Sequence, residues 1–145
     1  MKRTGKVCAV ITFFIAIFYS CFSQAQGSDK MIVKNIDGLE WHPKTTLPPG
    51  ASSDFAYGDP AKGHYYLYVK FPADYTVPAH WHSYTCMVTI IKGSMTIKRE
   101  GLPDETITEG GFFTLPAKMK YTAYTPEECL FTVGGENPFD IFYVN

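Results

Sequence analysis

Short strand-like runs follow one another along almost the whole chain, and this spacing restricts its fold more than any other feature. Runs of four to eight residues rich in β-branched and aromatic side chains are typical of β-strands. About ten occur, namely "MIVKNI", "SDFAY", "HYYLYVKF", "YTCMVTII", "SMTIKRE", "ETIT", "GFFTLP", "KYTAYT", "CLFTVG" and "DIFYVN". Turn-favouring residues separate them in "PPGASS", "GDPAKG", "PADYTVPA", "KGS", "EGLPDE", "EGG" and "GENP". Because no stretch carries a helical period, the pattern predicts an all-β sandwich or barrel.

The N-terminus has the pattern of a secretory signal peptide. Three basic residues, Lys2, Arg3 and Lys6, precede the uncharged apolar run Val7–Phe22. The segment Ser23–Ala25 then places small residues where a signal peptidase cuts. The apolar run is also shorter than the roughly 20 residues of a comfortable membrane span.

We therefore predict that residues 1–25 are a signal peptide and that residues 26–145 form one exported domain, periplasmic or secreted, with no membrane partner after cleavage. The 120 remaining residues are enough for a single core. Loss of three of the 13 basic residues leaves ten against 14 acidic ones, a formal charge of −4. Because no basic stripe occurs, nucleic acid is not expected as a partner.

Two histidines stand two residues apart in the stretch "PAHWHSYTCMVTIIKGSM". Alternate side chains of a strand share a face, so His80 and His82 are predicted to point the same way. If the strand continues without a bulge, Tyr84 and Cys86 share that face. Imidazole and thiolate both bind borderline and soft metals, so the spacing indicates part of a metal site. Histidines that only pack or face solvent are the alternative.

The same stretch resembles the first motif of the cupin superfamily, in which two histidines on one strand precede a glutamate and a glycine turn, here Gly93. Residues 110–124, "GGFFTLPAKMKYTAY", are similar to the second motif, with Gly110 or Gly111 first and then Pro116. The Pro-x-His-Trp-His form and the ending "GENPFDIFYVN" resemble small single-domain cupins of undefined activity. The resemblance implies a double-stranded β-helix, which is a jelly-roll barrel.

Two of the four usual cupin ligands are replaced in this sequence. Cys86 stands at the glutamate position, and Tyr121 stands at the position of the second-motif histidine. Only His80 and His82 keep the usual identity. Lys118 occupies a glycine position, where a left-handed backbone would cost a non-glycine residue about 1 kcal/mol. The resemblance therefore implies a degenerate metal site.

Three interpretations of this altered site remain open. In the first, the barrel binds a small apolar or aromatic molecule, or a sugar, without a metal. Pockets of this kind are mostly apolar with a few placed polar groups. The aromatic residues predicted to line it are Tyr84, Phe113, Tyr121, Tyr124 and Phe131.

In the second interpretation, a metal is kept by changed ligands. His80, His82 and Cys86 form the set, and Tyr121 or water completes it. A thiolate favours zinc or copper over the iron or manganese of a His3Glu cupin. The resemblance also implies oxygenase-like or isomerase-like enzymes as relatives. Among them are iron-dependent thiol dioxygenases, which carry a cysteine at the same position but keep the third histidine.

In the third interpretation, Cys86 forms a disulfide with Cys129, and the domain is a structural or interaction module. Disulfides persist in exported proteins, and this one requires Cα atoms within about 7 Å. The resemblance further implies a homodimer, because cupins often pair through their sheets.

Overall fold

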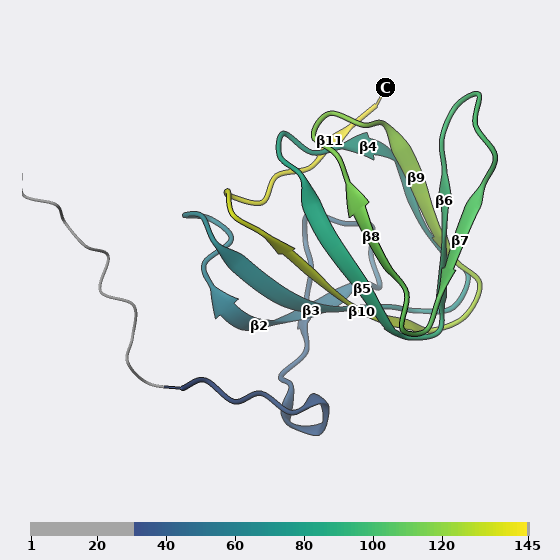
Figure 1. Ribbon diagram of the computed structural model, residues 1–145. Coiled ribbons are helices and arrows are strands. Elements are labelled where there is room, and N and C mark those ends of the chain that lie inside the picture. The colour runs from purple at the N-terminus through teal and green to yellow at the C-terminus, as the bar shows by residue number, and fades with distance from the viewer. Residues whose placement is uncertain (1–30, 145) are drawn as a thin grey trace, which may run out of the picture. The chain divides into compact units, whose positions relative to one another are not determined.

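Strands make up most of the regular structure in residues 31–144, the part of the chain that this computed structural model describes (Figure 1). The elements in chain order are η1 (Ile36–Gly38), β1 (His42–Pro43), β2 (Ser52–Gly58), β3 (Tyr65–Phe71), β4 (Tyr75–Trp81), β5 (Cys86–Lys92), β6 (Ser94–Lys98), β7 (Glu105–Thr108), β8 (Phe112–Leu115), β9 (Tyr121–Thr125), β10 (Cys129–Gly135) and β11 (Phe142–Tyr143). The predicted signal peptide lies outside the described residues. Within residues 31–144, no helix has the length and hydropathy needed to span a membrane.

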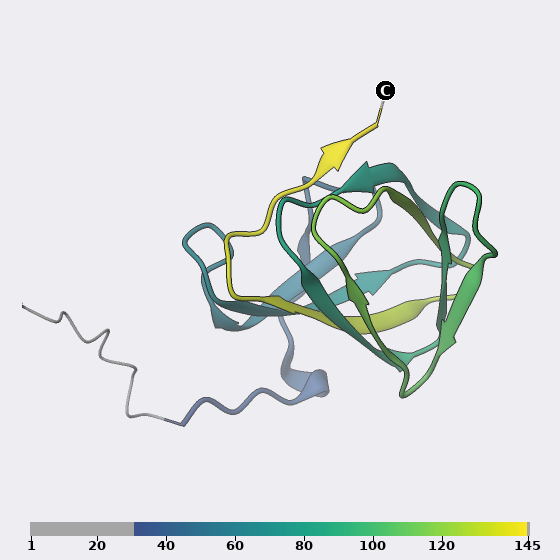
Figure 2. The ribbon, with the colours of Figure 1, turned by 45° about the horizontal axis from the view of Figure 1, so that its top comes forward.

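The strands form two antiparallel sheets that face each other across the core (Figures 1 and 2). One sheet has the order β1-β2-β3-β10-β5-β8, and the other has the order β11-β4-β9-β6-β7. Neighbours in each sheet are mostly distant in sequence, as expected when a chain winds between two sheets of a jelly roll. The predicted all-β, cupin-type barrel is therefore confirmed.

Alternation along the strands builds the core. In β3, the sequence "YYLYVKF" buries every second residue, Tyr65, Leu67, Val69 and Phe71, while the residues between them face outward. Leu67, Val77 and Ile90, from three different strands, are among the largest fully buried side chains. Burying such side chains contributes roughly 1.5–3 kcal/mol each, so the two inner faces hold the sheets together.

The turn between β5 and β6 depends on the missing side chain of Gly93. Its φ is 81°, a left-handed conformation that glycine adopts readily. A Cβ at this position would also lie 2.4 Å from the carbonyl oxygen of Glu128. Both the backbone conformation and the lack of space therefore favour glycine at position 93, where the chain passes from one sheet to the other.

The first predicted strand is wrong. Residues 31–35 belong to no strand, and Ile36 begins the 3-10 turn η1. Only the two residues of β1 pair, with Ser52 and Ser53 of β2. The side chains of this segment favour a β-strand, but no other strand forms backbone hydrogen bonds with it.

The segment "PADYTVPA" is also corrected, because most of it lies in β4 rather than in a turn. Pro78, the second of its two prolines, falls where the pairing of β4 with β9 shifts register, between Val77 and His80. A proline lacks the N–H that a regular ladder needs, and an irregularity of this kind removes the requirement.

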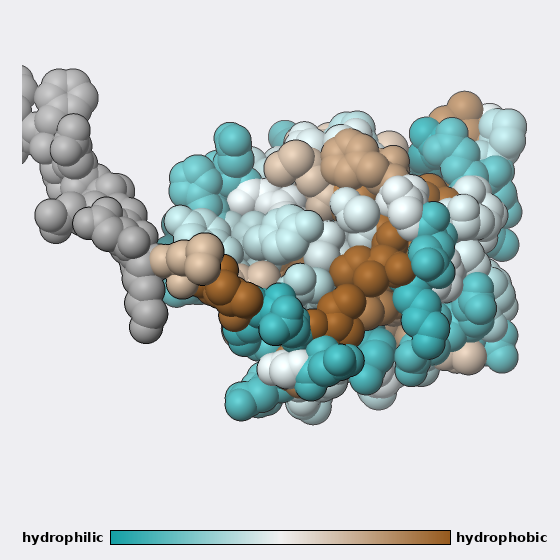
Figure 3. All heavy atoms as spheres, turned by 60° about the horizontal axis from the view of Figure 1, so that its bottom comes forward, coloured by the Kyte–Doolittle hydropathy of each residue, from teal (hydrophilic) through white to brown (hydrophobic). Residues whose placement is uncertain are grey.

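The outer face of the six-stranded sheet carries exposed apolar side chains. Met87 on β5 and Phe112 on β8 are 43% and 61% exposed. Their strand positions are diagonal to each other, since Met87 pairs with Thr114 and Thr89 with Phe112. Figure 3 looks onto this side of the molecule and shows apolar side chains gathered in a band across it.

Candidate functional site

A cavity of about 70 Å³ lies between the two sheets inside the barrel. Fourteen of its nineteen lining residues are apolar. The other five are Lys44, His80, His82, Cys86 and Tyr121. The fold therefore brings all four residues predicted as metal ligands to one apolar cavity, together with a lysine that the sequence did not single out.

Two strands of one sheet position His80 and Tyr121. His80 is the next-to-last residue of β4, and it pairs directly with Tyr121, the first residue of β9. Their rings lie 4.2 Å apart between centroids. His82 follows β4 immediately and is buried beside them, with its ring centroid 5.2 Å from that of His80. The prediction that the two histidines face the same way is confirmed.

Cys86 reaches the cavity by a different path from the one predicted. The chain bends at residues 83–85, and Cys86 begins β5 in the opposite sheet, where it pairs with Leu115. Cys86 thus faces the histidines from across the barrel rather than along one strand. The same bend turns Tyr84 outward, and its side chain is 45% exposed.

Backbone carbonyls set the tautomers of both histidines. A carbonyl oxygen only accepts hydrogen bonds, so Nδ1–H of His80 donates to the oxygen of Pro78 at 2.7 Å. Nδ1–H of His82 likewise donates to the carbonyl oxygen of Asp140. Each imidazole then presents the lone pair of its Nε2. The hydroxyl of Tyr121 donates to Nε2 of His82 at 2.8 Å.

Burial keeps these groups uncharged near neutral pH. Desolvation, with a smaller contribution from the neighbouring His82, lowers the pKa of His80 to about 4. Desolvation also lowers the pKa of His82 and raises that of Tyr121 well above the usual range for a phenol. The histidine end of the cavity is therefore a neutral hydrogen-bonding surface.

The thiol of Cys86 is held by its own hydrogen bonds. It donates to the carbonyl oxygen of Tyr84 at 3.8 Å, which leaves the hydroxyl of Tyr65 as donor to its Sγ at 3.5 Å. Burial raises the pKa of the Cys86 thiol, and burial together with the bond to Cys86 raises that of Tyr65. Cys86 is consequently a protonated thiol rather than a thiolate.

These residues fit a resident metal ion poorly. Only the two Nε2 lone pairs have the form that a metal needs, and one of them already accepts from Tyr121. The thiol and the phenol would both have to lose protons that burial favours keeping. Among residues 31–144, no group of three or more His, Cys, Asp or Glu side chains is placed to hold a metal. Structural and catalytic metal sites use three or four protein ligands.

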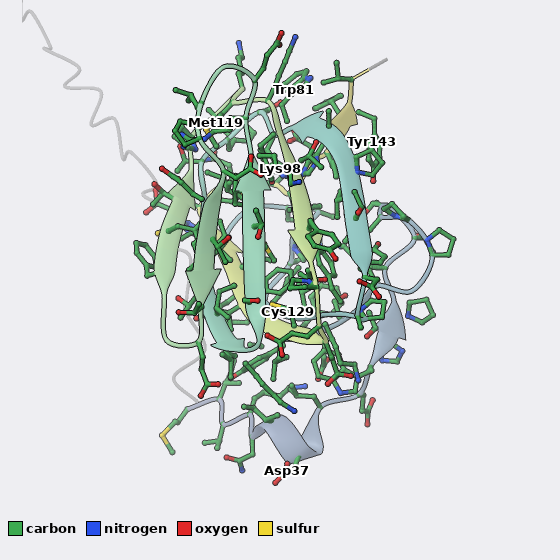
Figure 4. The ribbon with its side chains drawn as sticks, turned by 90° about the vertical axis from the view of Figure 1, so that its right-hand side faces the viewer. Asp37, Trp81, Lys98, Met119, Cys129 and Tyr143 are labelled. Atoms are coloured by element: carbon green, nitrogen blue, oxygen red, sulfur yellow. The ribbon has the colours of Figure 1, made fainter. Side chains whose placement is uncertain are left out.

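The predicted disulfide between Cys86 and Cys129 is not formed. Both are buried free thiols. Cys86 begins β5 and Cys129 begins β10, and these neighbouring strands run antiparallel, so the two residues lie at opposite ends of the pair. Figure 4 shows Cys129 at the end of the barrel away from Trp81 and Tyr143, which adjoin the histidines. The interpretation of the domain as a disulfide-stapled module is therefore wrong.

Three of the five aromatic residues predicted to line the pocket are found in the cavity. Phe113, Tyr121 and Phe131 line it, whereas Tyr84 and Tyr124 do not. Tyr124 lies an odd number of residues after Tyr121 on β9, so the two face opposite ways. The hydroxyl of Tyr124 instead donates to Asp74 Oδ1 at 3.0 Å on the outside of the sheet.

Several site residues were missed from the sequence. Tyr65 could have been found, because it begins the alternating inward face of β3. Lys44, Phe139 and Asp140 lie outside the paired strands, in segments whose position depends on the tertiary fold. Phe139 packs on the ring of His82 at 5.3 Å between centroids, and the Asp140 carboxylate accepts from the Ser83 amide at 2.8 Å. No local pattern marks these three residues.

Comparison with known families gives one match. A family model described as a domain of unknown function, DUF4437, matches residues 23–141, which is most of the chain. Among curated proteins, no match is found.

Solved structures similar to this chain include cupins and enzymes. The polyketide cyclase RemF from Streptomyces resistomycificus is 14% identical with a TM-score of 0.66, over 80% of this chain and 87% of that one. A putative acetylacetone dioxygenase from Methylibium petroleiphilum is 17% identical with a TM-score of 0.66, over 84% and 86%. An RmlC-like cupin from Shewanella frigidimarina is 12% identical with a TM-score of 0.61, over 74% and 92%. At these identities the likeness establishes the fold alone.

Proposed function

Since this chain belongs to the DUF4437 family and has the cupin fold, we propose that it is a small-molecule-binding barrel that takes its ligand into the internal cavity without a resident metal. The observation that carries the proposal is the cavity itself, apolar over fourteen of nineteen lining residues and polar at one end. Binding sites for small molecules commonly combine such a lining with a few converging polar groups.

The polar end defines what the ligand must offer. Nδ1–H of His80 donates to the backbone, so its Nε2 is a hydrogen-bond acceptor. No protein group donates to this nitrogen among the residues described. Nε2 of His82, by contrast, is already satisfied by Tyr121. A ligand hydroxyl that donates to His80 would satisfy the remaining acceptor, which is worth about 0.5–1.5 kcal/mol.

The cavity also limits the size of the ligand. At roughly 10–15 Å³ for each water-sized group, about 70 Å³ holds roughly five to seven such groups. A short branched alcohol therefore suits the space, whereas a polycyclic molecule needs the lining to move. This places 3-methylbutan-1-ol among suitable test ligands.

Titration of the protein with 3-methylbutan-1-ol, followed by amide chemical shifts, tests the proposal. We expect saturable shifts at cavity-lining residues. Ala123→Leu adds three carbon atoms to the cavity wall and should weaken binding about tenfold or more. Ala79→Leu is the matched control, since Ala79 is exposed on the same sheet. No saturable shifts in the wild type, or equal binding by both variants, would contradict the proposal.

A further inference from the structure

Lys44 is a half-buried cation that the barrel leaves without a counter-ion. It lines the cavity, and burial lowers the pKa of its ammonium group. Every ion pair found in residues 31–144 uses other residues, namely Lys34 with Asp54, Lys62 with Asp59, Lys98 with Asp104 and Arg99 with Glu105. None of the nineteen lining residues is acidic. Taking a charge partly out of water without a partner is unfavourable, so its retention here requires an explanation.

Packing accounts for only part of the stabilisation of Lys44. Its Nζ lies 5.0 Å from the ring centroid of Phe139, and an aromatic face attracts a cation. That attraction is modest at a partly exposed site, and it supplies no hydrogen-bond acceptor for the ammonium protons. The nearby Asp140 does not fill this role, since its carboxylate accepts from Ser83 and no ion pair joins it to Lys44 among the described residues.

Lys44 also lies near the polar end of the cavity. The ring of Phe139 adjoins Lys44 on one side and packs 5.3 Å from the ring of His82. The other polar lining groups there are neutral near pH 7, because burial lowers the pKa values of the two histidines and raises those of Cys86 and Tyr121. Lys44 is thus the one formal charge that the lining presents to a ligand.

We propose that Lys44 is a recognition residue for an anion and that the ligand of this cavity is a small aliphatic carboxylate. The inference rests on the proposed ligand-binding function and narrows it to one chemical class. Its carboxylate would pair with Lys44, and its apolar body, roughly four to six carbons long, would occupy the apolar lining. A hydroxyl on the same molecule would find its acceptor in Nε2 of His80.

Three probes with one branched body and different head groups test this inference: 3-methylbutanoate, 3-methylbutan-1-ol and 3-methylbutan-1-amine. We expect 3-methylbutanoate to bind about tenfold more tightly than the alcohol, since a hydrogen bond between two charged groups is stronger than one between neutral groups and the partial exposure of Lys44 to solvent weakens it. The amine should bind most weakly, because its charge repels that of Lys44. Affinities are measured by calorimetry at low and high salt, and the preference for the acid should shrink as salt rises.

Variants assign the preference to one residue. Lys44→Met keeps an unbranched apolar stem and should remove the preference, so that acid and alcohol bind alike. Lys44→Arg keeps the charge and should retain the preference, which guards against a simple loss of folding. Lys62→Met, at an exposed lysine whose side chain is 83% accessible, should behave as the wild type.

The outcomes separate the two proposals. If the alcohol binds but the acid has no advantage, or if the advantage survives Lys44→Met, the role of Lys44 is refuted and the ligand-binding barrel stands. If none of the three probes binds, both proposals fail. A preference that is lost in Lys44→Met and kept in Lys44→Arg supports the inference.

Discussion

Replacing Lys118 by glycine should stabilise this protein. Lys118 has a φ of 63°, in the left-handed region, and it is one of two non-glycine residues with positive φ among residues 31–144. Its side chain is exposed and makes no ion pair in the described structure. Its backbone is constrained, however, since its N–H donates to the carbonyl oxygen of His82 at 2.7 Å. This hydrogen bond to His82 offsets part of the backbone strain at Lys118.

The size of the effect follows from two opposing quantities. The left-handed conformation costs a residue with a Cβ about 1–2 kcal/mol, which glycine avoids. Glycine also makes the unfolded chain more flexible, which costs about 0.4–1 kcal/mol. The net expectation for Lys118→Gly is a gain of about 0.5–1 kcal/mol in the free energy of unfolding. For a domain of this size, this corresponds to a rise in Tm of about 2–5 °C.

Urea unfolding and calorimetry of Lys118→Gly and Lys118→Ala measure this gain. The alanine variant also removes the charge and the long stem of Lys118 but keeps the Cβ, so it should be no more stable than the wild type. If the two variants have the same Tm, the left-handed strain is not what limits stability at this position. A glycine variant less stable than the alanine variant would refute the reasoning altogether.

Two further predictions concern pH and association. The pKa of His80 is about 4 in the fold and near 6.5 in an unfolded chain, so the unfolded state binds more protons between these values and stability falls as pH drops from about 6.5 to 4. The free energy of unfolding should fall by up to about 3 kcal/mol over this range, and by less in His80→Gln. Urea unfolding at several pH values measures both losses, and equal losses in the two proteins would contradict the prediction. We also predict a homodimer through the outer face of the six-stranded sheet, so Phe112→Glu should give a monomer by light scattering. The matched substitution Thr76→Glu, at an exposed position of β4 on the other sheet, should not. A monomeric wild type would end that prediction.

Local pattern was sufficient to predict the fold class. Residues such as Leu67, Val69 and Phe71 alternate inward because a half-buried strand requires it, and the same alternation is legible in the sequence. It failed where pairing rather than propensity decides, as in residues 31–36 and at Pro78 in β4. Strand formation needs a partner, and a partner distant in sequence leaves no local mark.

The candidate site was predicted in part for the same reason. The His80–His82 face follows from the period of a strand and is found in the cavity. Cys86 is also there, but by way of a bend and a second sheet that strand periodicity does not reveal. Lys44 and Phe139 come to the cavity from segments that belong to no paired strand. Their positions depend on the completed barrel, so spacing in the sequence could not indicate them.

The order in which the site is assembled follows from the contacts of His82. Its ring is oriented by Asp140, 58 residues later in the chain, and its carbonyl oxygen accepts from Lys118. The segment that includes β11 and Val144 also pairs with β4, and the amide of Val144 donates to the carbonyl oxygen of Ala79. During synthesis, the histidine segment therefore emerges long before the residues that orient it. A chain truncated before Asp140 would keep most of its core while losing the contact that orients the imidazole of His82.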